Sequence, residues 1–264
     1  MFKKFFNAIA GLFKRKTVLE KSVSKVKSCE EGGVCPIVDP IYPNKAMRGL
    51  LWYPNAVQGP RMKAQGRLKE GYPVGAIVHF TAGRGGGLER AITEISAAAQ
   101  KYNFLCIADT GEIVQPNPLN EWGYHAGESA WKFSKLFSGS VSDETIGIEM
   151  NNAGIVEKVG ENRFKTWFGT YLTADQVRYV TEKTYGCPTG YYHKYTDAQE
   201  KTLIEFLVWL IKNDPTERMS YETILGHHEV AGKLGLGRWR KNDPGGALSM
   251  TMPQLRQVIK ELTV

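Results

Sequence analysis

Hydrophobic and polar positions alternate along the chain in patterns that predict strands and helices in turn. The runs 74–80 and 145–150 are short, apolar and contain β-branched residues, as buried strands do. Apolar residues recur at helical spacing over 88–101 and over 197–212. Two further apolar runs flank Asp109-Thr110-Gly111, which predicts a β-hairpin. Strands that alternate with helices favour an α/β fold with a mixed central β-sheet flanked by helices.

The remaining segments of the folded region carry weaker signals. Thr173 followed by Gln176 has the spacing of a capping box and predicts a helix over 173–185. Pro253 suits the first turn of a final helix, which we expect to end near residue 262. Two aromatic-rich stretches are expected to be loops: 152–172, with Trp167, Phe168 and Tyr171, and 186–195, with Tyr191, Tyr192, His193 and Tyr195.

The N-terminal segment has a different character. Residues 1–16 place phenylalanine, leucine and isoleucine at helical spacing, with lysine and arginine at both ends. Such an amphipathic helix either lies in the interface of an anionic membrane or docks on the domain or on a partner protein. It is too short to span a bilayer and fits a secretory signal peptide poorly. Residues 17–45 have the composition of a linker, so we place the folded domain at 46–264.

Composition and charge narrow the class of partner. Hydrophobic residues make up 42% of the chain and charged residues 23%, as in a soluble globular protein. Residues 1–27 hold eight basic side chains and one acidic one, which accounts for the whole net charge of +7. Because nucleic-acid-binding proteins usually carry basic charge on the folded domain, we expect no nucleic-acid partner. Cys106 lies in an apolar run and should be buried, whereas Cys29 and Cys35 either pair or stay free thiols.

Polar residues suited to metal chemistry lie near the ends of predicted strands. His79 and Glu149 lie near the ends of two of them, and His227 ends a third apolar run. In open α/β sheets, ligands bind beyond the carboxyl ends of the strands. A carboxylate on an apolar strand has to be paired, protonated or functional. The stretch 226–245 adds more ligand and charge candidates, although by itself it could be a surface turn: His228, Glu229, Lys241 and Asp243.

Six short motifs follow one another along the chain: Val78-His79-Phe80-Thr81-Ala82-Gly83, Tyr102-Asn103-Phe104, Tyr124-His125-Ala126-Gly127, Ile146-Gly147-Ile148-Glu149, Gly226-His227-His228-Glu229-Val230 and Arg240-Lys241-Asn242-Asp243-Pro244-Gly245. Together they resemble the zinc-dependent N-acetylmuramoyl-L-alanine amidases, whose fold is shared with amidase-type phage lysozymes and peptidoglycan recognition proteins. The resemblance covers about residues 70–262.

The resemblance implies a Zn²⁺ site with the ligands His79, His227 and Asp243. The register of the motif selects His227 rather than its neighbour His228. This chain departs from the family between residues 229 and 240, where it is longer than the compact turn common among relatives, so this insertion must loop out for Asp243 to reach the metal.

The resemblance also implies roles around the metal. Glu149 matches the glutamate that assists the zinc-bound water, and Lys241 matches the lysine that faces the developing oxyanion. Tyr102 matches a tyrosine near the metal. His125 and Thr81 would lie along the substrate. The aromatic-rich stretches either contact glycan or serve ordinary packing.

The function implied by the resemblance is that of a peptidoglycan hydrolase. It would cleave the amide between N-acetylmuramic acid and L-alanine of the stem peptide, as a bacteriolytic phage or prophage lysin acting at the cell wall. It would be made in the host cytoplasm or carried in a virion. The alternative is a non-catalytic peptidoglycan-binding protein of the same fold. The presence of Glu149, Lys241 and Asp243 favours the enzyme, because binding alone needs none of them.

Overall fold

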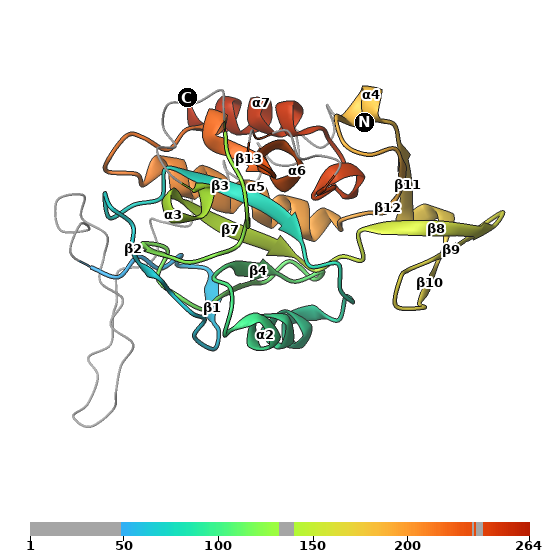
Figure 1. The fold of residues 1–264 in the computed structure, drawn as a ribbon, viewed down its shortest axis with the longest axis horizontal. Helices are drawn as coiled ribbons and strands as arrows, with labels where there is room; N and C mark the ends of the chain where they lie inside the picture. Colours follow the sequence, from blue (N-terminus) through green and yellow to red (C-terminus); the bar gives the residue numbers. More distant parts are fainter. Residues whose placement is uncertain (1–48, 132–139, 234, 236–239) are drawn as a thin grey trace, which may run out of the picture. The chain divides into compact units, whose positions relative to one another are not determined.

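The computed structural model describes residues 49–131, 140–233, 235 and 240–264 (Figure 1). The predicted helix over 1–16, the linker and the pair Cys29 and Cys35 lie outside these ranges and stay predictions. Part of the insertion between residues 229 and 240 lies outside them too. None of the helices within the described ranges combines the length and the apolar character needed to cross a membrane.

A six-stranded mixed sheet forms the centre of the fold. Its order is β1 (Ala56–Gln58), β5 (Ile113–Gln115), β4 (Leu105–Ile107), β7 (Thr145–Met150), β3 (Gly75–Phe80) and β13 (Ile224–Gly226). Only the hairpin pair β4 and β5 is antiparallel, and the other neighbours are parallel. The α/β class with a mixed central sheet, the strands at 74–80 and 145–150, and the hairpin around Asp109-Thr110-Gly111 are thereby confirmed.

Helices pack on both faces of this sheet. Helix α2 (Gly87–Ala98) buries Ala91 and Ile95 in a cluster with Cys106 of β4. The neighbouring residues of β4, Leu105 and Ile107, alternate to the opposite face, where we place α5 (Asp197–Lys212), which packs against β4 and α7 (Met252–Thr263). Both helices were predicted from the sequence, and the structure adds a capping box at the start of each.

A second, antiparallel sheet replaces the predicted aromatic-rich loops, which were wrong. Its order is β10 (Tyr171–Leu172), β9 (Arg163–Lys165), β8 (Ile155–Gly160), β12 (Gly190–His193) and β11 (Val177–Val180). An apolar cluster packs against this sheet, and the sequence analysis did not predict it. It consists of Ala153, Val156, Phe164, Leu172 and Val177. Strands β8 to β10 lie beyond the arrowheads of β3 and β7 (Figure 1).

The predicted helix over 173–185 was also wrong. The capping box of Thr173 and Gln176 is present, but it closes a single 3₁₀ turn, Ala174–Gln176. The next four residues form β11 and bury Val177 and Val180, because pairing with β12 satisfies their backbone groups in place of helical hydrogen bonds. The shorter elements are β2 (Gly66–Arg67), β6 (Glu121–Trp122), α3 (Val141–Glu144), α4 (Glu182–Tyr185), α6 (His227–Val230) and the 3₁₀ turns Tyr221–Thr223 and Gly245–Ala247.

The second sheet supports the chain that follows Asp243. The Nη1 atom of Arg178 in β11 donates to the carbonyls of Gly246, Ala247 and Leu248 at 2.8, 3.1 and 2.6 Å. A Cβ at Gly246 would lie 2.8 Å from Val180, so only glycine allows this close approach. The segment that follows Asp243 is therefore held by β11.

Candidate metal centre

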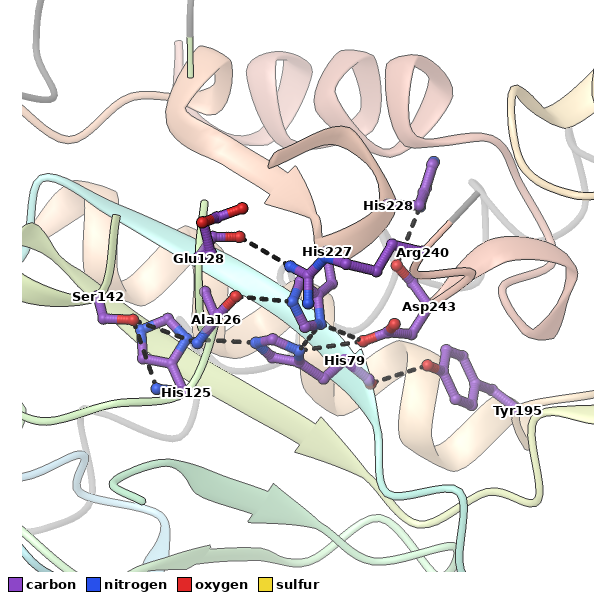
Figure 2. A network of polar contacts seen from close by, with 10 residues as sticks. All are labelled: His79, His125, Ala126, Glu128, Ser142, Tyr195, His227, His228, Arg240 and Asp243. Atoms are coloured by element: carbon purple, nitrogen blue, oxygen red, sulfur yellow. Dashed lines mark hydrogen bonds and ion pairs between the residues drawn. The ribbon is translucent and has the colours of Figure 1, made fainter. Parts of the chain in front are cut away.

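Three side chains that are far apart in the sequence meet at one point. His79 lies near the end of β3, His227 begins α6 directly after β13, and Asp243 lies on the loop that the second sheet supports. The Nδ1 atoms of the two histidines are 2.9 Å apart, and Asp243 Oδ2 lies 3.0 Å from His79 Nδ1 and 2.9 Å from His227 Nδ1 (Figure 2). β3 and β13 are parallel neighbours in which Gly226 lies opposite Val78. The next residue on each chain segment, His79 and His227, is therefore brought to the same place.

The outer nitrogens of both histidines show which ring atoms face the centre. His227 Nε2 lies 3.0 Å from the carbonyl of Ala126, which can only accept, so Nε2 carries the hydrogen. His79 Nε2 lies 3.3 Å from Nδ1 of His125, whose own Nε2 lies 3.4 Å from the carbonyl of Thr145. Because the carbonyl of Thr145 accepts from Nε2 of His125, Nδ1 of His125 carries no hydrogen and accepts from Nε2 of His79. The hydrogen is therefore on Nε2 in both His79 and His227. Both Nδ1 lone pairs are thus free to face Asp243 and each other.

The convergence of these donors fits a metal ion. All three ligand atoms lie within 4.8 Å of one another and are buried. Zinc bonds of 2.0–2.1 Å would place neighbouring tetrahedral ligands about 3.3 Å apart, close to the spacing observed. Two imidazoles and one carboxylate are three protein ligands, and a fourth position remains for water or substrate.

Electrostatics around the three residues agree with this assignment. Burial, and next the neighbouring His227, lower the pKa of His79 to about 4, so its ring is neutral at pH 7. Burial alone would raise the pKa of Asp243, but the close contacts of its carboxylate with the rings of His227 and His79 outweigh burial and hold that pKa well below its usual range. A neutral imidazole and an ionised carboxylate are the forms that bind a metal.

His228 has a different task from His227, as predicted from the motif. Its backbone N–H and its Nδ1 both lie 3.0 Å from the carbonyl oxygen of Asp243. His228 therefore holds the backbone of the third ligand and keeps its ring away from the centre. Glu229 is structural as well, because it accepts from the N–H of Gly226 at 2.8 Å and pairs with Arg256 at 2.9 Å.

Glu149 lies beside the centre on the adjacent strand. In the parallel pair of β3 and β7 it is directly opposite His79, so both side chains leave the same face of the sheet. Its Oε2 is buried and has no hydrogen-bond partner within the described part of the chain. Burial, and next the carboxylate of Asp243, raise the pKa of Glu149 to about 8, while Lys241 lowers it. An orphaned carboxylate oxygen with a pKa near neutrality is suited to proton transfer.

Lys241, two residues before Asp243, lies close enough to act on both sides of the centre. Its charge opposes the raised pKa of Glu149 and contributes to the lowered pKa of His79. The side chain is half-buried. The structure therefore brings a cation within electrostatic reach of Glu149 and His79.

The remaining predicted site residues, His125, Thr81 and Tyr102, are not among the three candidate ligands. His125 is buried behind His79, where its hydrogen bond orients that ring, and a Cβ at Gly147 would lie 2.7 Å from its Cγ. Thr81 Oγ1 accepts the backbone N–H groups of Gly83 and Asn152 and so holds the turn after β3. Tyr102 is 44% exposed between α2 and β4, and its role stays a prediction.

Sequence reasoning did not foresee the outer acceptors. The carbonyl of Ala126 orients His227, and the carbonyl of Thr145 orients His125, which in turn contacts His79. The sequence does not reveal such bonds, because every residue supplies a backbone carbonyl. Two features of the sequence could have indicated these contacts. His125 is next to Ala126, and Gly147 leaves room for the ring of His125.

A model of the N-acetylmuramoyl-L-alanine amidase family matches residues 70–246. That range includes the three candidate ligands, Glu149 and Lys241. The chain belongs to this family. The prediction of an amidase of the peptidoglycan amidase family is thereby confirmed, and the set of polar residues around the centre is that of an enzyme.

Solved structures with a similar fold include other amidases. The amidase is 22% identical to an AmpD derivative, over 80% of this chain and 99% of that one, with a TM-score of 0.47. It is 20% identical to AmiD from E. coli, over 75% of this chain and 61% of that one, with a TM-score of 0.44. PlyL is 14% identical, over 79% and 99% of the two chains, with a TM-score of 0.42. No curated protein matches the sequence.

The raised pKa of Glu149 predicts a pH-dependent stability of the amidase in a metal chelator. Between the ordinary pKa of 4.5 and the folded pKa of about 8, the unfolded chain has lost a proton that the folded chain retains. Stability therefore falls as pH rises through this window and is constant above it. Glu149→Gln lacks this loss, so its thermal unfolding midpoint should exceed that of the wild type by a margin that is smallest near about pH 5 and reaches a plateau above about pH 8. A margin that is constant with pH would contradict the assignment.

Proposed function

We propose that this amidase is a zinc-dependent peptidoglycan hydrolase that cleaves the amide between the lactyl group of N-acetylmuramic acid and L-alanine of the stem peptide. The observation that carries the proposal is the meeting of two free Nδ1 atoms and a carboxylate beside the orphaned oxygen of Glu149. Zinc held by His79, His227 and Asp243 would polarise the scissile carbonyl and lower the pKa of water to about 7.

Glu149 is the proton carrier in this proposal. Its Oε2 accepts the proton of the attacking water and returns it to the nitrogen of L-alanine as the C–N bond breaks. A pKa near neutrality suits both halves of that cycle, because the same group must take and release a proton at one pH.

Lys241 stabilises the negative charge that develops on the carbonyl oxygen. Its ammonium group is held near the centre because Asp243 follows it by two residues and is itself fixed by His228 and by the second sheet. Removing a donor of this kind typically costs about 100- to 1000-fold in rate. The ligand-orienting bonds of His125 and Ala126 keep the two Nδ1 atoms aimed at the same point.

We further propose that the amidase acts at the bacterial cell wall as a phage or prophage lysin, and that residues 1–16 carry it to an anionic membrane surface. The basic and apolar composition of that segment supports the second statement.

Zinc binding should distinguish the two adjacent histidines. His227→Ala removes a ligand and should abolish stoichiometric zinc in the purified protein. His228→Ala removes only a bond to the carbonyl of Asp243 and should retain most of the metal. Zinc content by atomic emission, with circular dichroism to confirm folding, gives the comparison. Equal zinc loss in folded forms of both variants would contradict the assignment of His227.

Digestion of purified cell wall identifies the bond that is cleaved. New amino termini of L-alanine should appear without new reducing sugar ends, and a chelator should stop their release until Zn²⁺ is added back. Glu149→Gln should bind zinc and release at least about 100-fold less product, within the range of lost general acid–base catalysis. Reducing ends in the digest would instead make the protein a glycosidase.

The membrane role of residues 1–16 rests on their charge. Replacing Lys14, Arg15 and Lys16 by glutamate in the full chain should abolish sedimentation with vesicles rich in anionic lipid, because each basic residue contributes about 1 kcal/mol of attraction. Neutral vesicles serve as the control. Unchanged binding to anionic vesicles would leave docking on a protein as the role of the segment.

A further inference from the structure

Trp167 is an exposed aromatic residue whose orientation is nevertheless fixed. It lies between β9 and β10 and is 73% exposed. Its Nε1–H donates to the carbonyl of Ala82 at 2.6 Å, and Ala82 itself has a φ of 50°, rare outside glycine. The polar atom of the indole is therefore bonded within the protein, while most of the apolar ring stays exposed.

This position is at the rim of the candidate metal centre. Ala82 follows His79 by three residues, a chain distance of at most about 11 Å. The strand that carries Glu149 continues through residues 151–154 into β8 and then to Trp167. Figure 1 shows β8 and β9 beyond the arrowheads of β3 and β7, the side where ligands of open α/β sheets bind.

The neighbours of Trp167 make its position rigid. Phe168 meets it edge to face with ring centroids 5.4 Å apart, and the guanidinium of Arg84 lies 5.2 Å from the Phe168 centroid. Phe168 packs in turn on the apolar cluster of the second sheet. A side chain on an exposed hairpin would otherwise lose rotamer freedom on binding, so this fixed geometry lowers the entropic cost of contact with a ligand.

We infer that Trp167 binds a sugar ring of the peptidoglycan glycan strand, next to the muramic acid residue held at the metal centre. This inference rests on the proposed function and specifies a substrate-binding residue for it. The C–H bonds on one face of a pyranose ring are weakly positive and pack on the electron-rich face of an indole. The N–H of the indole is already bonded to Ala82 and is not available to a carboxylate of the stem peptide.

The test compares a long and a short substrate with the full chain. Insoluble peptidoglycan offers sugars on either side of the cleaved residue, whereas a soluble muramyl peptide with one sugar offers none. Trp167→Ala should lower the ratio of kcat/KM on the polymer to kcat/KM on the short substrate about tenfold, mainly through KM. Trp167→Phe keeps an aromatic face and should recover part of that ratio.

Tyr171 provides a matched control on the same hairpin. It is 50% exposed and pairs with Lys165, so it lies on the opposite sheet face from Phe164 and Leu172. Tyr171→Ala should leave the substrate ratio unchanged. A fall as large as that of Trp167→Ala, or equal losses on both substrates with Trp167→Ala, would overturn the inference and leave a structural role.

A binding measurement separates this inference from the proposed function. Glycan strands freed of stem peptides contain no scissile amide, so the intact protein can be titrated with them. The wild type should bind them about tenfold more tightly than Trp167→Ala. If the wild type cleaves neither substrate, the proposed function fails and the strand titration still decides the role of Trp167. Equal strand affinity of the two proteins would overturn it.

Discussion

The convergence of two imidazole lone pairs and one carboxylate in a buried place is the constraint on which the rest of the structure depends. The Nδ1 atoms of His79 and His227 lie 2.9 Å apart, with Asp243 Oδ2 at the same spacing. Such an arrangement is repulsive without a cation or a shared proton, and the protein holds it by bonds behind each ligand. His125 and the carbonyl of Ala126 orient the rings, while His228 holds the backbone of Asp243. The protein itself thus orients the candidate ligands.

The two sheets divide the work of building this centre. The central sheet sets the register that places His79 opposite Glu149 and the start of α6 beside the end of β3. The second sheet holds the chain after Asp243 through Arg178 and carries Trp167 to the carbonyl of Ala82. Because residues 151–154 link β7 to β8, one stretch of chain supplies both the proposed proton carrier and the proposed glycan contact, and one substrate can meet both.

The agreement between sequence and structure follows the strength of the local signals. The predictions of strands at 74–80 and 145–150 and of a helix over 197–212 are correct. A strand buried on both faces appears in the sequence as an apolar run, and a helix with one buried face appears as apolar residues at helical spacing. The helix over 173–185 failed because a capping box signals only a first turn, and strand pairing with β12 decided what came next. The aromatic-rich stretches were taken for loops because short antiparallel strands carry a weak pattern, and their burial depends on partners far along the chain.

The sequence by itself determined the fold class and the family, and it predicts His79, His227, Asp243, Glu149 and Lys241 as the site residues, because these residue types stand within recognisable motifs. Tertiary structure decided which ring nitrogens face the centre, that His228 binds a carbonyl, and that Oε2 of Glu149 is left without a partner in the described part of the chain. It also decided that Trp167 lies against the loop after β3. The physical reason is that tautomers, orphaned atoms and rim contacts depend on distances between segments that lie 15 to 148 residues apart in the chain, and local sequence does not specify those distances.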